Sequence, residues 1–154
     1  MVFRKIVSIA INLIAVIISI IGFVLIRDSL SGVIFVKYFT LVTNTLIVFV
    51  GLLSIGYGID SILKKDEETS LPTFVFALKL ITATCALITF LTVVTYLQYT
   101  AYKGIGPDSP MFWNNLFHHY IAPLAFVSGL VFFDLDKKYS FKLSGIFSEF
   151  IIVE

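Results

Sequence analysis

The stretch IVSIAINLIAVIISIIGFVLI, Ile6 to Ile26, decides the fold class. It contains no charged residue, and Asn12 is its only strongly polar side chain. A run of about 20 apolar residues is long enough to cross the hydrocarbon core of a bilayer as a helix. Arg4 and Lys5 precede the run, as in a signal peptide, but a signal peptide has an apolar core of only about 7–15 residues and a small-residue cleavage site. No Ala-x-Ala site follows Ile26, so we expect an uncleaved transmembrane helix.

Three further apolar runs follow, separated by a charged loop and by a loop rich in Gly and Pro. The expected helices cover about 6–26, 38–59, 72–99 and 110–133. A charged tail leads to a last piece, LSGIFSEFIIVE, which is too short and too acidic to span a bilayer. The sequence therefore predicts an all-α fold: one domain over 1–154, a polytopic membrane helical bundle of four transmembrane helices plus a short C-terminal segment.

The composition supports a membrane protein and excludes several other classes. Of the 154 residues, 58% are hydrophobic and 14% are charged, whereas soluble domains carry about 25% charged residues. The net charge of +1 argues against nucleic acid as a partner, so the expected partners are membrane lipids. Cys85 is the single cysteine, which excludes an intrachain disulfide. No Cys/His metal spacing and no cofactor motif is present, and without a clear GxxxG pattern the oligomeric state stays unassigned.

Counting Lys and Arg on the two sides of the expected helices predicts the orientation. With the N-terminus inside, seven basic residues lie on the inner side: Arg4, Lys5, Lys64, Lys65, Lys137, Lys138 and Lys142. Three lie on the outer side: Arg27, Lys37 and Lys103. We therefore expect a multi-pass protein of the cell membrane with both termini cytoplasmic. Lys79, about two turns into the third helix, is expected to extend its ammonium group to the inner headgroups.

The third helix carries a row of small and polar side chains at helical spacing: Thr82, Cys85, Thr89, Thr92 and Tyr96. Steps of three and four residues place them on one face. One interpretation is a packing seam, because small residues let membrane helices approach closely. The other is that Thr92 and Tyr96, at the outer end of the row, line a polar binding cavity.

The second helix begins KYFTLVTN, with Thr40 and Asn44 one turn apart on one face. A threonine in a membrane helix commonly donates its hydroxyl proton to the carbonyl four residues earlier. The Asn44 side chain is harder to explain as packing, because its amide needs hydrogen-bond partners in an apolar medium. Asn44 is therefore a candidate binding residue beside Thr40.

The stretch NNLFHHYIAP, Asn114 to Pro123, places two histidines inside the fourth helix. They lie about nine residues from the helix start, roughly 13 Å along the axis at 1.5 Å per residue, in the outer half of the membrane with Thr40. Asn115 is three residues before His118 and four before His119. Pro123 has no N–H, so the carbonyl of residue 119 is expected to lose its helical partner. The residues are either a structural hydrogen-bonded pair or a general base held by an asparagine.

These segments resemble the androgen-induced-gene-type membrane proteins and their bacterial six-pass relatives. The resemblance extends from Lys37 to Asp134 and is carried by KYFT, Lys37 to Thr40, and by Asn-x-x-x-His with a following proline. Some animal members are threonine hydrolases that cleave fatty-acid esters of hydroxy fatty acids. The resemblance implies that Thr40 is the nucleophile, with Phe39 where the animal proteins have leucine.

The same resemblance implies that the base is the histidine of the Asn-x-x-x-His motif. Asn114 has that spacing to His118, and Asn115 has it to His119. The proline spacing of the bacterial relatives favours His119, and that of the animal members favours His118, so both stay candidates.

Two functions follow from the sequence. The first is a lipid-ester hydrolase that uses a Thr–His dyad on a fatty-acyl ester, with Asn44, Asn114, Asn115, Thr92 and Tyr96 as binding residues. The alternative is a non-catalytic membrane protein, a lipid-binding, transport or structural subunit, whose polar residues only pack helices.

Overall fold

The computed structural model describes residues 2–26, 39–64, 71–100 and 103–134, and within them the chain forms long helices and no strand. The first two long helices are α1 (Val2–Ile26) and α3 (Phe39–Leu63). The third consists of α4 (Thr73–Thr92), η2 (Val93–Leu97) and α5 (Gln98–Thr100). The fourth consists of α6 (Pro110–Asn115), η3 (Leu116–Ile121), α7 (Ala122–Ser128) and η4 (Gly129–Asp134). The predicted all-α class is confirmed.

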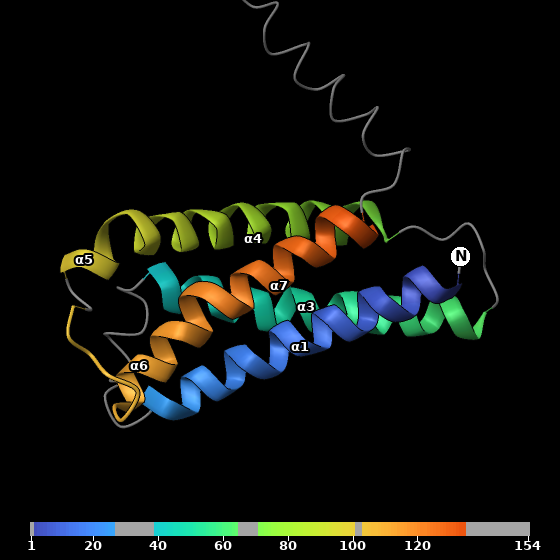
Figure 1. Cartoon of the computed structure of the whole chain (residues 1–154). Coiled ribbons are helices and arrows are strands. Elements are labelled where there is room, and N and C mark those ends of the chain that lie inside the picture. The colour runs from blue at the N-terminus through green and yellow to red at the C-terminus, as the bar shows by residue number, and fades with distance from the viewer. Residues whose placement is uncertain (1, 27–38, 65–70, 101–102, 135–154) are drawn as a thin grey trace, which may run out of the picture.

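Successive helices run in opposite directions and form a four-helix bundle (Figure 1). α1 packs against α3 and against the whole fourth helix, α3 packs against α4, and α4 packs against α7. The helices therefore form a ring in which α1 lies diagonally across from α4, and α3 lies across from the fourth helix. The short C-terminal segment that the sequence predicts lies outside the described residues.

The observed helix limits agree with the predicted ones to within about one turn. α3 continues beyond residue 59 to Leu63 because Lys64 donates its backbone N–H to the Asp60 carbonyl at 2.9 Å and its ammonium to the Asp60 carboxylate at 2.7 Å. The fourth helix begins at Pro110, where Ser109 is the N-cap and its hydroxyl accepts the Met111 N–H at 3.2 Å. Proline is favoured at this first position because its missing N–H has no partner there anyway.

Polar side chains occupy the interior of this bundle, and large apolar side chains cover much of its surface. Ile14, Ile17, Leu52, Leu91 and Val131 are all exposed. The buried polar residues include Asn12, Ser19, Thr43, Asn44, Lys79, Thr82, Thr89, His118 and His119. Polar groups avoid hydrocarbon and face protein instead, so this distribution suits a lipid environment. Together with four 25-residue stretches apolar enough to cross a bilayer, it identifies a multi-pass integral membrane protein.

Three π-helical segments interrupt the described helices, one in the third helix and two in the fourth. A π-helical turn inserts an extra residue and rotates the side chains beyond it relative to those before it. Short π segments of this kind occur often at functional sites. In this chain, η3 contains both histidines.

Candidate functional site

The histidine cluster comprises Ser19, Gly22, Asn44, His118 and His119, near the end of the bundle where α3 begins. The His118 ring is fully buried, and its Nε2 lies 2.9 Å from the Ser19 carbonyl oxygen. A carbonyl oxygen only accepts, so Nε2 carries the hydrogen in this arrangement. Nδ1 of His118 has no hydrogen-bond partner among the described residues. The ring is therefore held in one orientation against α1.

Gly22 makes room for that ring. A Cβ at position 22 would lie 2.3 Å from His118 Nε2 and 2.4 Å from Cδ2, far inside van der Waals contact. On the next residue, the Phe23 ring contacts the imidazole edge at a centroid distance of 4.7 Å. α1 thus contacts His118 in three ways: Gly22 leaves room for the ring, the Ser19 carbonyl accepts its hydrogen bond, and the Phe23 ring packs against it.

Asn44 ties three helices together through one side chain. Its Nδ2 donates to the Thr40 carbonyl at 2.9 Å and to the His118 carbonyl at 3.1 Å. Its Oδ1 accepts the Ser19 hydroxyl proton at 3.1 Å. The amide that the sequence identified as needing partners is satisfied within the protein, and the start of α3 lies directly beside the histidine turn.

The bond from Asn44 to His118 replaces one that Pro123 cannot make. At the end of η3, the Ala122 N–H bonds to the Phe117 carbonyl, which is π-helical spacing. In that register the next acceptor is the His118 carbonyl, whose donor would be the nitrogen of residue 123. Proline has no N–H to give. The prediction that residue 119 has the freed carbonyl is therefore wrong by one position, because it assumed α-helical spacing.

His119 lies between two residues whose directions are fixed by contacts. His118 faces α1, whereas Tyr120 faces α4, where its hydroxyl donates to Gln98 Oε1 at 2.8 Å and its ring packs against Phe90 at 5.8 Å. His119 is 5% exposed, so its ring points into the bundle and not toward lipid. We infer that it occupies the side of the fourth helix that faces α3.

Thr40 lies at the start of α3 and is half-buried. The acceptor that a back-bonded Thr40 hydroxyl would use belongs to Val36, outside the described residues. Two later threonines of the same helix do make this bond: Thr43 to the Phe39 carbonyl and Thr45 to the Leu41 carbonyl, both at 2.8 Å. Thr43 is therefore a natural comparison for Thr40, with its hydroxyl already committed.

Asn114 and Asn115 lie one turn nearer the start of the fourth helix than the histidines. They are 9% and 7% exposed, and the Oδ1 atom of each has no hydrogen-bond partner among the described residues. Buried polar atoms are usually paired, so unpaired ones suggest a place for water or for a ligand. Both asparagines stay candidates for binding a polar group near the histidines.

Thr92 and Tyr96 do not line a cavity inside the bundle. Both are exposed, Tyr96 by 62%, whereas the buried face of the third helix runs through Thr82, Ala86, Thr89 and Val93. Of the row predicted from the sequence, Thr82 and Thr89 lie on this face, whereas Cys85 is only partly buried. Over Thr82 to Thr89 the packing-seam interpretation fits the observed burial. The outer end of the row, Thr92 and Tyr96, points away from the interior. The buried positions of the helix are Ala86 and Val93, one residue after Cys85 and Thr92.

A second polar group, the lysine cluster, was not recognised as a unit in the sequence. It comprises Ser8, Asn12, Lys79 and Asp134. Lys79 is fully buried, forms an ion pair with Asp134 and donates to Asn12 Oδ1 at 2.7 Å. Ser8 donates to the other oxygen of Asp134 at 2.6 Å. The expectation that Lys79 reaches the headgroups is therefore wrong, because a carboxylate at the end of the fourth helix satisfies its charge inside the protein.

The described residues contain no group of three His, Cys, Asp or Glu side chains placed to hold a metal ion. The side chains of the histidine and lysine clusters are groups that transfer protons and form hydrogen bonds. Comparison with family models, with curated proteins and with solved structures gives no match to this chain.

Proposed function

We propose that this membrane protein is a lipid-ester hydrolase with Thr40 as nucleophile and His119 as general base. The observation that carries the proposal is the Asn44 amide nitrogen, which bonds the carbonyls of both Thr40 and His118. One side chain thus holds the threonine turn of α3 against the histidine turn of the fourth helix. The resemblance of KYFT and Asn-x-x-x-His to the androgen-induced-gene-type hydrolases supports the same pair.

Two observations favour His119 over His118 as the base. The His118 ring is held on α1 by the Ser19 carbonyl and enclosed by Gly22 and Phe23. The contacts of His118 and Tyr120 lead us to infer that the His119 ring lies on the side of α3, where Thr40 lies. In this proposal His118 and Asn44 are positioning residues that set the turn carrying His119.

The chemistry needs only these groups, an ester and water. His119 accepts the Thr40 hydroxyl proton while the oxygen attacks the ester carbonyl, and the alcohol leaves with that proton to give an acyl-threonine. Water then attacks the acyl group, His119 takes its proton, and the fatty acid leaves as the Thr40 hydroxyl is restored. The substrate class is a fatty-acyl ester that enters from the surrounding lipid.

The proposed location follows the charge distribution of the sequence. Arg4, Lys5 and Lys64 lie at one end of the bundle, and the histidine cluster lies toward the other. Basic residues concentrate on the cytoplasmic side of membrane proteins. We therefore place the termini in the cytoplasm and the Thr40–His119 pair in the outer half of the cell membrane.

The test is covalent labelling of the purified protein with an alkyl fluorophosphonate. The wild-type protein should be labelled on Thr40, and Thr40→Val should abolish labelling because the variant keeps the shape of the side chain but lacks the hydroxyl. Thr43→Val is the matched control, since the Thr43 hydroxyl already donates to the Phe39 carbonyl. Equal labelling of the wild type and Thr40→Val would rule out Thr40 as the nucleophile.

A non-catalytic role is the second candidate, and the hydrogen bonds of two buried side chains, Asn44 and Lys79, favour it. The Asn44 amide and the Lys79 ammonium both have several partners within the protein. Under this role His118→Gln and His119→Gln should both reduce thermal stability in detergent, without any ester hydrolysis to lose. The hydrolase proposal expects a split: His119→Gln stays folded and loses hydrolysis, whereas His118→Gln loses stability.

A further inference from the structure

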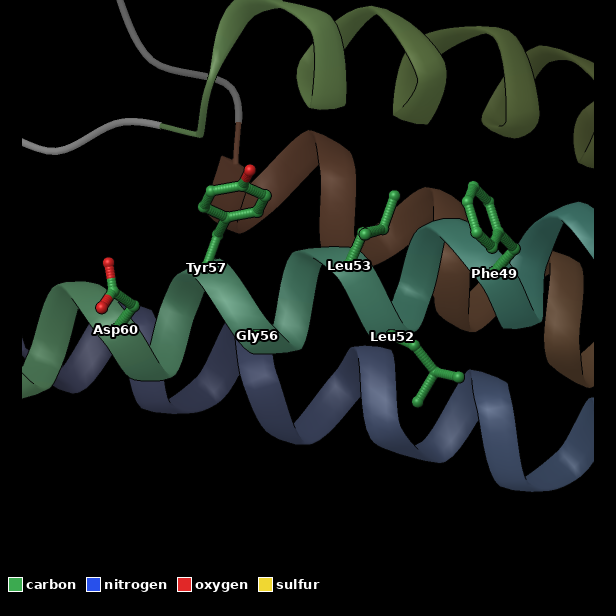
Figure 2. A pocket seen from close by; sticks show the side chains of 6 residues that line it. All are labelled: Phe49, Leu52, Leu53, Gly56, Tyr57 and Asp60. Atoms are coloured by element: carbon green, nitrogen blue, oxygen red, sulfur yellow. The ribbon is translucent and has the colours of Figure 1, made fainter.

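A shallow groove runs along the exposed side of α3, at the opposite end of that helix from Thr40. Its lining residues are Phe49, Leu52, Leu53, Gly56, Tyr57 and Asp60, and its volume is about 420 Å³. Figure 2 shows Phe49, Leu53 and Tyr57 on one side of the helix and Leu52 on the other, toward α1. The groove shares no residue with the histidine or lysine cluster.

Gly56 produces the hollow. A Cβ built at position 56 meets no atom within 4 Å, so the glycine faces open space and not a packed neighbour. Phe49 and Leu52, which are 56% and 53% exposed, line the end of the groove nearer the middle of α3. An apolar side chain added at position 56 would fill this space without displacing another helix.

The groove is apolar at one end and charged at the other. Tyr57 and Asp60 lie at the end of α3 that Phe49 does not reach (Figure 2). Asp60 pairs with Lys64 on the next turn at 2.7 Å, and both side chains are more than half exposed. Two opposite charges and an exposed aromatic ring thus lie at one end of the groove. From there its apolar lining extends about 12 Å along α3, eight residues at 1.5 Å each.

This order of groups matches the order of groups in a zwitterionic phospholipid. A carboxylate and the face of a tyrosine ring both attract a cationic amine. A neighbouring lysine suits a phosphate. The acyl chain of the same lipid would extend along Gly56 toward Phe49.

We propose that the α3 groove binds a zwitterionic glycerophospholipid from the bilayer leaflet on the side of Lys64. The Asp60 carboxylate and the Tyr57 ring bind its amine, Lys64 binds its phosphate, and one acyl chain fills the groove over Gly56. The charges of Asp60 and Lys64 complement the amine and the phosphate of the lipid, and the apolar lining complements its acyl chain. A second protein helix would fit the apolar lining but would not need the charged pair at its end.

The test is native mass spectrometry of the full chain in detergent, with equal amounts of phosphatidylethanolamine or phosphatidylglycerol added. We expect at least threefold more adduct with phosphatidylethanolamine. Asp60→Asn should remove this preference, and Gly56→Leu should reduce the adducts of both lipids at least threefold. Thr84→Leu places a leucine at an exposed position of α4, outside the groove, and should leave the adducts unchanged.

Lys64→Gln separates binding by the carboxylate from simple loss of the Asp60–Lys64 ion pair. The variant also breaks that pair but keeps the carboxylate, so the preference for phosphatidylethanolamine should persist. Equal binding of the two lipids by the wild type would overturn the proposal. So would unchanged adducts in Gly56→Leu, or the same loss of preference in Lys64→Gln as in Asp60→Asn.

Discussion

At the scale of single residues, Gly22 and the His118 ring it accommodates determine how α1 meets the fourth helix. Gly22→Ala places a methyl group 2.3 Å from His118 Nε2, so the ring must move and its bond to the Ser19 carbonyl must break. Overpacking of a well-packed interior costs about 1–3 kcal/mol. We expect a lower midpoint of thermal unfolding in detergent. Gly56→Ala, where the added methyl meets open space, should not lower the midpoint, because alanine favours the helix more than glycine does. An equal loss in both variants would contradict this role for Gly22.

Lys79 and Asp134 give a second prediction at this scale. Removing one partner of a buried ion pair leaves an uncompensated charge and costs about 3–5 kcal/mol, whereas replacing both partners by apolar residues is often nearly neutral. Lys79→Met and Asp134→Leu should therefore each destabilise the protein, and the double variant should be more stable than either single one. A double-mutant cycle of unfolding free energies measures this coupling. Additive losses would show that the two side chains do not stabilise each other.

At the scale of the element, the fourth helix depends on Asn44 because of Pro123. Asn44→Leu leaves the His118 carbonyl without a donor, and a buried carbonyl left unpaired costs about 1–3 kcal/mol. In a Pro123→Ala background the backbone N–H at position 123 becomes available, so Asn44→Leu should cost less there. Unfolding of the four proteins in denaturant measures the difference. The same cost in both backgrounds would mean that the proline does not create the need for Asn44.

The elements themselves could be predicted from the sequence because each one is an apolar run bounded by charged or Gly/Pro-rich segments. Ser109 and Pro110 located the start of the fourth helix correctly. The rotation of side chains could not be predicted in the same way. The π-helical spacing at Phe117 and Ala122 makes His118 the residue whose carbonyl lacks a backbone donor, and the sequence carries no plain signal for such a turn.

The candidate site was predictable to a similar depth. Asn44, His118 and His119 were identified because polar residues in a membrane helix are costly. Thr40 was identified only through the resemblance of KYFT to the androgen-induced-gene-type proteins. The structure then places Asn44 between Thr40 and His118. The close packing of the His118 ring on Gly22 and the ion pair between Lys79 and Asp134 are contacts between positions far apart in the chain. Local pattern does not reveal such contacts, and for this reason Lys79 was expected to reach the headgroups and not a carboxylate inside the protein.

At the scale of the whole molecule, the predicted orientation places residue 103 outside the cell and residue 64 inside. With Cys85 replaced by alanine, a single cysteine at position 103 should react with a membrane-impermeant maleimide on intact cells. A single cysteine at position 64 should react only after permeabilisation. The opposite pattern would invert the bundle and place the histidine cluster in the cytoplasmic half of the membrane.

The central claim is that a Thr40–His119 pair inside this bundle hydrolyses lipid esters, and turnover by the reconstituted protein tests it most directly. The measurement is release of free fatty acid from a fatty-acyl ester of a hydroxy fatty acid in proteoliposomes. We predict steady release by the wild type and by Thr43→Val, and at least a hundredfold loss in Thr40→Val and His119→Gln. No release by a folded wild-type protein, or release by Thr40→Val equal to that of the wild type, would contradict the account.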